Sequence, residues 1–343
     1  SGTLTVNNAD YTVAQLVKIN NGTSGSIVLN TDNAALTGTV ADIKAAFAGT
    51  ITTHTGTLEI TDTGGTDITA THITDINGTN TGTITVANAI DINGSGSEVK
   101  AAFDAIDTNT GNATANITGT DYTIAQLKAI NNATAGEIVL ATPTANLSGE
   151  VADIVAAFAG TVTTNTGTIT ISDAGTTDIQ ATDIATINTA ITGAITVTST
   201  IDINGSGADV AAAFTAIDTN TGNATANITG TDYTVAHLKT INDKTTGAIV
   251  LATPTANLTG SVSDTVDAFA GTVTTNTGTI TFNDSAGADI TATDITNLNA
   301  KITGNITFNS AVDINGSGSQ VKAAFDVIDS NGNATANITG NDY

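Results

Sequence analysis

Short stretches of alternating apolar and polar residues recur along the chain, each directly after a glycine. The middle of the chain holds four of them: Gly136–Leu140, Gly167–Ile171, Gly193–Val197 and Gly222–Ala226. Alternation with a period of two is typical of a strand that buries one face, and the many β-branched residues agree with that assignment. We therefore predict four short strands in this part of the chain.

Between these strands the apolar residues follow the spacing of a helix. Val151, Ile154, Val155 and Phe158 stand at positions i, i+3, i+4 and i+7, which form one stripe on a helix surface. Two further stripes have the same character, and they comprise Ile184, Ile187 and Ile191, and Val210, Phe214 and Ile217. The sequence thus predicts short amphipathic helices that alternate with the strands.

The expected helix starts carry capping sequences. Ser95–Glu98, Ser206–Asp209 and Ser317–Gln320 each place an acceptor three residues after a serine, which is the pattern of a capping box. The residue three positions after the serine changes from Glu to Asp to Gln, so this position needs a hydrogen-bond acceptor and not a charge. This indicates a capping role and not a catalytic one.

A long internal repeat organises these elements. The string Asp-Ile-Asn-Gly-Ser-Gly begins at Asp91, Asp202 and Asp313, with a spacing of 111 residues each time. We divide the chain into a leading edge (1–9), three repeats (10–120, 121–231 and 232–341) and the start of a next turn (342–343). Over the 111 residues that begin at Ile117, four similar segments start at Ile117, Leu147, Ile179 and Ile203.

A segment of this length cannot bury its own apolar face, whereas stacked copies can. We therefore expect an α/β solenoid, in which short parallel strands and short helices form a right-handed coil. Three repeats of four turns each would make one continuous body, with one strand–helix pair per turn.

The composition excludes several classes of function. The chain has 343 residues, 8 lysines and no arginine, and its formal net charge is -24. Nucleic acid binding is excluded because no basic surface can neutralise phosphates, and no apolar run is long enough to insert into a membrane. Cysteine is absent, which excludes disulfides and thiol catalysis. Methionine is also absent, so we expect a processed product or a segment of a longer chain.

One turn in each repeat resembles the first half of a calcium loop. The candidate ligand pairs are Asp107 with Asn109, Asp218 with Asn220, and Asp329 with Asn331. Calcium prefers six to eight oxygen ligands, which such side chains and carbonyls supply. The bidentate glutamate that closes an EF-hand is absent, and aspartate in a turn also bonds its own backbone. Calcium binding and a purely structural turn both stay open.

No residue pattern predicts an active site. His54, His72 and His237 are replaced one repeat away by Asn165, Asp183 and Gln126, so we interpret them as polar surface positions. The recurring carboxylates occur three times in equivalent settings, which disfavours a glycoside hydrolase with a single acid–base pair. We expect a protein that is not an enzyme.

The threonines on the expected strands are also compatible with a different function. Outward positions include Thr168, Thr170, Thr196, Thr198 and Thr225, and a flat array of this kind resembles ice-binding proteins. The neighbouring strand instead carries Glu137, Val139 and Ala141, so the array is irregular. Ice binding is kept as an alternative function, and so is a calcium-stiffened adhesive domain.

Two segments of the sequence resemble known proteins. Residues 120–132 (Thr-Asp-Tyr-Thr-Ile-Ala-Gln-Leu-Lys-Ala-Ile-Asn-Asn) and 151–158 (Val-Ala-Asp-Ile-Val-Ala-Ala-Phe) are each followed by a glycine and a strand. The style of repeat resembles tracts in very large secreted or surface proteins of bacteria, cyanobacteria among them. The resemblance implies an extracellular or cell-surface role in a fibre, a surface layer or an adhesin stalk.

The two ends of the sequence correspond to the same part of the repeat. Ser1–Val6 already alternates like a strand, and Asp342-Tyr343 repeats Asp10-Tyr11. We therefore expect the repeat to continue, either covalently or through head-to-tail contact with another copy of the chain.

Overall fold

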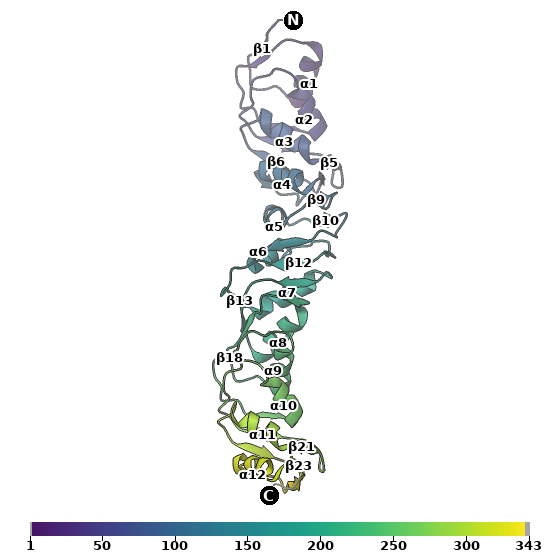
Figure 1. The fold of residues 1–343 in the computed structure, drawn as a ribbon. Helices are drawn as coiled ribbons and strands as arrows, with labels where there is room; N and C mark the ends of the chain where they lie inside the picture. Colours follow the sequence, from purple (N-terminus) through teal and green to yellow (C-terminus); the bar gives the residue numbers. More distant parts are fainter. Residues whose placement is uncertain (1, 340–343) are drawn as a thin grey trace. The chain divides into compact units, whose positions relative to one another are not determined.

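Short helices and short strands alternate along the whole described chain (Figure 1). The computed structural model describes residues 2–339. The helices are α1 (Val13–Gly22), α2 (Val40–Ala46), α3 (Ala70–Thr79), α4 (Gly96–Ala105), α5 (Ile124–Ala133), α6 (Val151–Ala157), α7 (Ala181–Ala190), α8 (Gly207–Ala216), α9 (Val235–Asn242), α10 (Val262–Ala268), α11 (Ala292–Asn299) and α12 (Gly318–Val327).

The strands have two to four residues. In the first half they are β1 (Leu4–Val6), β2 (Ile27–Leu29), β3 (Leu36–Gly38), β4 (Leu58–Ile60), β5 (Asp67–Thr69), β6 (Ile84–Val86), β7 (Asp91–Gly94), β8 (Thr108–Asn109), β9 (Thr114–Ile117), β10 (Ile138–Leu140), β11 (Leu147–Gly149) and β12 (Ile169–Ile171). In the second half they are β13 (Asp178–Gln180), β14 (Ile195–Val197), β15 (Asp202–Gly205), β16 (Thr219–Asn220), β17 (Thr225–Ile228), β18 (Ile249–Leu251), β19 (Leu258–Gly260), β20 (Ile280–Phe282), β21 (Asp289–Thr291), β22 (Ile306–Phe308), β23 (Asp313–Gly316) and β24 (Thr335–Ile338).

The chain divides into two compact units, residues 1–168 with 190–193, and residues 169–189 with 194–343. The first unit contains the sheets β1-β2, β3-β4-β6-β8 and β5-β7-β9-β10. The second unit contains the strand sets β12-β14-β16, β13-β15-β17-β18, β19-β20-β22 and β21-β23-β24. Their pairings are parallel, so the coarser part of our expectation, an α/β repeat fold of short parallel strands and short helices, is confirmed.

Two strands lie between successive helices, where we had predicted one. Between α7 and α8, for example, stand both β14 and β15. The additional strand β15 buries only Ile203 deeply, with Asp202 and Asn204 half-buried beside it. A single inward residue is too short a pattern to reveal a strand from alternation alone.

The predicted strand at Gly222–Ala226 is wrong in its bounds, because the strand is β17 (Thr225–Ile228). Ala224, Ala226 and Ile228 are fully buried, so the predicted phase was right. Gly222 lies in the turn before the strand, and a Cβ atom there would lie 2.2 Å from the carbonyl oxygen of Ser199. The glycine is present because two turns of backbone approach closely at this point.

The predicted helical stripes face the core. Ile184, Ile187 and Ile191 are buried, and so are Val210, Phe214 and Ile217. On α6, Val151 and Ile154 are buried, whereas Val155 and Phe158, which follows the last residue of the helix, are only half-buried. Burial of these stripes against the strands supplies the hydrophobic stabilisation of each unit.

The capping boxes are confirmed at two of the three helix starts. Ser95 and Glu98 exchange bonds with each other's backbone N–H groups, as do Ser317 and Gln320. At α8, Ser206 accepts from the Asp209 N–H, but the shorter Asp209 carboxylate accepts from the Ser206 hydroxyl instead (2.6 Å). The bonds from Ser95 lower the pKa of the Glu98 carboxyl.

Candidate functional site

The aspartates of the predicted calcium turns bond to the start of a strand in the preceding turn. Oδ2 of Asp107 accepts from the N–H of Ile84 (2.8 Å), and the Asp107 N–H donates to the Ile84 carbonyl oxygen (3.0 Å). Asp218 and Ile195 form the same pair of bonds, as do Asp329 and Ile306. Each aspartate therefore clamps one turn of the chain to the next.

The neighbouring asparagines close their own turns. Oδ1 of Asn109 accepts from the N–H of Ala113, and Oδ1 of Asn220 accepts from the N–H of Ala224, both at 3.0 Å. Asn331 differs, because its Oδ1 accepts from the Asn333 N–H (3.1 Å) in the shortened third turn. These asparagines thus form the hydrogen bonds to their own backbone that are expected of a structural turn.

The same contacts bear on the predicted calcium ligands. One carboxylate oxygen of each aspartate and Oδ1 of each asparagine already have backbone donors. Among residues 2–339, no three histidine, cysteine, aspartate or glutamate side chains gather in a group suited to a metal ion. Calcium binding at these turns stays a prediction, and its ligands would have to include carbonyl oxygens.

A row of amide side chains, which the sequence analysis missed, follows the sheet β5-β7-β9. Nδ2 of Asn116 donates to Oδ1 of Asn93 (3.0 Å), and Nδ2 of Asn93 donates to Oδ1 of Asp67 (3.0 Å). In the second unit Asn204 donates to Asp178 (2.9 Å), and Asn315 donates to Asp289 (3.0 Å). The exact recurrence of Asp-Ile-Asn-Gly was the signal that could have revealed this side-chain ladder.

His54 is buried, so our interpretation of it as a polar surface position is wrong. Its ring has no exposed surface and packs against Phe47, with ring centroids 5.5 Å apart. Nδ1 lies 3.0 Å from Oδ1 of Asn80, which is itself buried. The Asn80 amide is oriented by Gly82, whose N–H donates to Oδ1 and whose carbonyl accepts from Nδ2. Nδ1 of His54 therefore carries the proton that Asn80 accepts.

The later repeats place asparagine at the same buried position. Nδ2 of Asn165 donates to the carbonyl oxygens of Ala145 and Gly167, and its Oδ1 accepts from the Tyr122 hydroxyl (3.0 Å). Asn276 has the same bonds to Ala256 and Gly278, and it accepts from Tyr233 (2.8 Å). Burial raises the pKa of the Tyr122 and Tyr233 hydroxyls, partly opposed by backbone hydrogen bonding.

The two other histidines lie at the surface of helices. His72 on α3 and His237 on α9 are half-buried. The N–H of His237 donates to the Thr234 hydroxyl at the helix start (3.2 Å), in the position where Gln126 caps α5. Neither histidine lies in a group of three or more side chains suited to metal binding among the described residues.

The outward threonines form in-register rows on the small sheets. Thr281 and Thr307 are opposite each other on β20 and β22, with hydroxyl oxygens 3.1 Å apart. In the first repeat the row is interrupted, because Glu59 stands opposite Thr37 and Thr85. The Thr281 and Thr307 hydroxyls thus make an ordinary cross-strand hydrogen bond, and ice binding stays a prediction.

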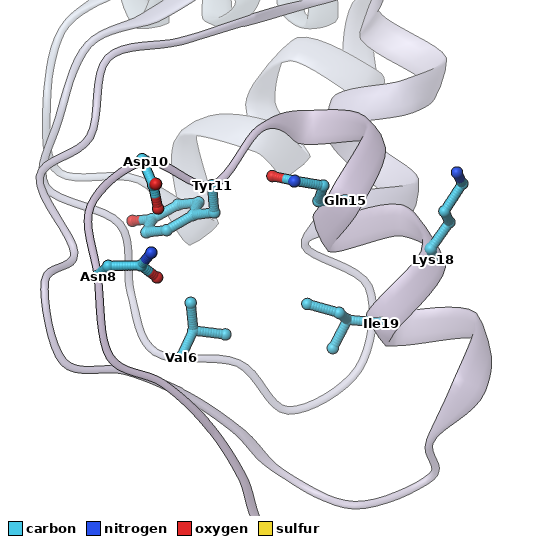
Figure 2. Close-up of a pocket in the computed structure, with 7 residues that line it drawn as sticks. All are labelled: Val6, Asn8, Asp10, Tyr11, Gln15, Lys18 and Ile19. Atoms are coloured by element: carbon cyan, nitrogen blue, oxygen red, sulfur yellow. The ribbon is translucent and has the colours of Figure 1, made fainter.

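A cavity of about 440 Å³ lies beside the first helix (Figure 2). Its lining comes from β1, from α1 and from the loop that joins them, and it comprises Val6, Asn8, Asp10, Tyr11, Gln15, Lys18 and Ile19. Figure 2 shows the Tyr11 ring between Asp10 and Gln15, with Val6 and Ile19 on the opposite side. Apolar side chains and a few polar groups line it, which is the character of a packing surface as much as of a ligand site.

No helix among residues 2–339 is long and apolar enough to cross a membrane. The chain matches no protein-family model, and no curated protein matches it either.

Proposed function

We propose that the chain is a structural repeat module of an extracellular or cell-surface protein, in a fibre, a surface layer or an adhesin stalk. One observation carries the proposal: the side chains with the chemistry of a site are used to join turns. Asp107 clamps Ile84, Asn116 bonds Asn93, and Tyr122 bonds Asn165. Such bonding stabilises a repetitive body and supports a structural role for the recurring carboxylates.

The proposal includes the finer architecture. We propose a right-handed solenoid with four turns in each 111-residue repeat, over the repeats 10–120, 121–231 and 232–341. Equivalent residues make equivalent contacts in successive repeats, as Asp107, Asp218 and Asp329 do. Nearest-neighbour contacts of this kind are characteristic of repeat proteins.

The module is proposed to continue end to end, either within a longer chain or by contact with another copy. The net charge of -24 opposes side-by-side bundling at low ionic strength. Salt screens that repulsion over about 8–10 Å at physiological ionic strength.

Three measurements test the proposal. Antibodies against the purified chain should label intact, non-permeabilised cells of the source. Electron microscopy of the purified chain should show rods of uniform width. The chain should not turn over a panel of polysaccharides, and turnover that one carboxylate substitution abolishes would show it to be an enzyme.

A further inference from the structure

The side chain of His54 is enclosed within the first repeat. It has no exposed surface, and its ring packs against Phe47 with the ring centroids 5.5 Å apart. The backbone of His54 joins two successive turns of the chain, because its N–H donates to the Thr79 carbonyl oxygen (3.0 Å) and its carbonyl oxygen accepts from the Thr81 N–H (2.8 Å). The ring is therefore buried at a join between turns.

The two ring nitrogens of His54 differ in their surroundings. Nδ1 lies 3.0 Å from Oδ1 of Asn80, whose amide is held by Gly82, so Nδ1 carries the proton of the neutral ring. Nε2 is then an acceptor without a proton. Within residues 2–339, this buried atom has no hydrogen-bond partner. The site thus suits the neutral imidazole and not the charged one.

A second proton on this ring has to bind at Nε2. The resulting imidazolium would be a buried charge whose new N–H group has no acceptor, which costs far more free energy than a buried neutral ring. Outside the core, water solvates both the charge and the N–H group. Protonation of His54 and exit of its ring from the core are therefore coupled.

The ionisable groups on the elements around His54 are engaged elsewhere or lie on the outer side of a helix. They are Tyr11, Asp32, Asp42, Lys44, His72 and Asp75. Lys44 of α2 pairs with Asp75 of α3 (2.9 Å), and Asp42 accepts from the Thr39 hydroxyl (2.9 Å). Asp32 accepts from the Thr55 hydroxyl (3.1 Å), and the Tyr11 hydroxyl donates to the Thr31 carbonyl oxygen (2.9 Å). In the described structure none of these groups bonds to Nε2.

The later repeats have the same join without a titratable group. Asn165 and Asn276 stand at the position of His54, and their amides bond to neighbouring carbonyl oxygens. The Asn165 carbonyl oxygen accepts from the Thr192 N–H, and that of Asn276 accepts from the Thr303 N–H, both at 2.9 Å. A response to acid through this position is therefore confined to the first repeat.

We propose that His54 is an acid-sensitive switch: its protonation in mildly acidic solution expels the ring and opens the join between residue 54 and residues 79–81, while the corresponding joins of the later repeats stay closed. An exposed imidazole takes up a proton near about pH 6.5. The open state binds one proton more than the closed state, so its population rises by up to about tenfold for each pH unit below that value. This switch does not depend on the proposed structural function.

Hydrogen exchange followed by mass spectrometry tests the switch on the unmodified chain. The amide protons of His54 and Thr81 report the join directly, because both are donated across it. Between about pH 7 and about pH 5, their protection, corrected for intrinsic exchange, should fall about tenfold or more. The Thr192 amide, which makes the corresponding bond to Asn165, should keep its protection.

The matched variant is His54→Asn with Asn80→Ile, which recreates the residue pair of the second repeat. It should be folded by circular dichroism and should lose the acid response. Comparison with the unmodified chain also separates His54 from the carboxylates, which take up protons at lower pH and are the same in both chains. His72→Asp, the change to the counterpart Asp183, removes a half-buried histidine and should leave the response intact.

NMR of the chain with 15N-labelled histidine provides a readout that needs no variant. One of the three rings should be in the neutral Nδ1–H form at about pH 7, and it should gain its second proton only as the join opens. A ring that becomes protonated while the His54 and Thr81 amides keep their protection would overturn the proposal. An acid response of the same size in the His54→Asn/Asn80→Ile variant, or at Thr192, would do so as well. None of these results bears on the structural function, which has its own tests.

Discussion

Nδ1 of His54 and Oδ1 of Asn80 lie 3.0 Å apart in a fully buried part of the first repeat. The corresponding pairs are Asn165 with Ile191 in the second repeat and Asn276 with Ile302 in the third. The two positions change together from one repeat to the next. A histidine at the first position needs a hydrogen-bond acceptor at the second, whereas an asparagine at the first position does not. His54 and Asn80 thus form one coupled structural unit.

This pairing predicts a non-additive double-mutant cycle. Asn80→Ile should destabilise the chain by about 1–3 kcal/mol, because it leaves Nδ1 of His54 buried without an acceptor. His54→Asn with Asn80→Ile recreates the pair of the second repeat and should recover part of that loss. Urea unfolding of both single variants and the double variant measures the coupling, expected to be about 0.5–3 kcal/mol. Strictly additive effects would show that the two residues are independent.

The buried tyrosines predict a loss of stability at alkaline pH. The pKa values of Tyr122 and Tyr233 are raised above 10.0 in the folded state, chiefly by burial. A raised folded pKa contributes stability that is present below the unfolded pKa and is lost as pH rises through the folded pKa. The melting temperature should therefore fall above about pH 10. The Tyr122→Phe/Tyr233→Phe variant should show a smaller fall, and an unchanged pH profile would contradict this origin.

The Asp107 clamp predicts different effects for two substitutions. Asp107→Ala removes the acceptor of the Ile84 N–H and should cost about 1–3 kcal/mol of unfolding free energy. Asp107→Asn keeps an acceptor oxygen and should cost less. Denaturant unfolding compares the two, and equal losses would indicate that the charge matters and the hydrogen bond does not.

Calcium titration of Asp218→Asn tests the metal prediction separately. A melting temperature of the unmodified chain that rises with millimolar calcium, but not with magnesium, would support a metal at this turn. The rise should then disappear in the variant, because asparagine lacks the charge that calcium prefers.

Because turns of the chain approach each other closely at some glycines, we expect that adding a single methyl group there destabilises the fold. A Cβ atom at Gly304 would lie 2.0 Å from the carbonyl oxygen of Gly278, a backbone atom that cannot move alone. Gly304→Ala should therefore destabilise the chain by about 1–3 kcal/mol. Gly175→Ala is the control, because its nearest neighbour would be 3.7 Å away. Thermal unfolding of both variants should separate them, and similar melting temperatures would contradict the close approach.

The order of residues along the chain was enough to predict which residues alternate and which faces are apolar. Strand phase, helical stripes and serine caps depend on neighbours within a few residues, so Ile184, Val210 and Ser95 could be assigned from spacing alone. The 111-residue repeat also indicated that the same local structures recur. These features are local, and local geometry restricts them strongly.

The contacts of the polar residues became known only from the folded structure. Tyr122 and Asn165 are 43 residues apart, and Asn80 is 26 residues from His54. Sequence spacing does not say which turn a side chain reaches, so His54 was placed at the surface. The second strand of each turn was missed for the same reason: Asp202–Gly205 is a strand because β13 and β17 pair with it, and its own composition is that of a turn. Contacts between turns are set by the stacking of turns, which no short window of sequence contains.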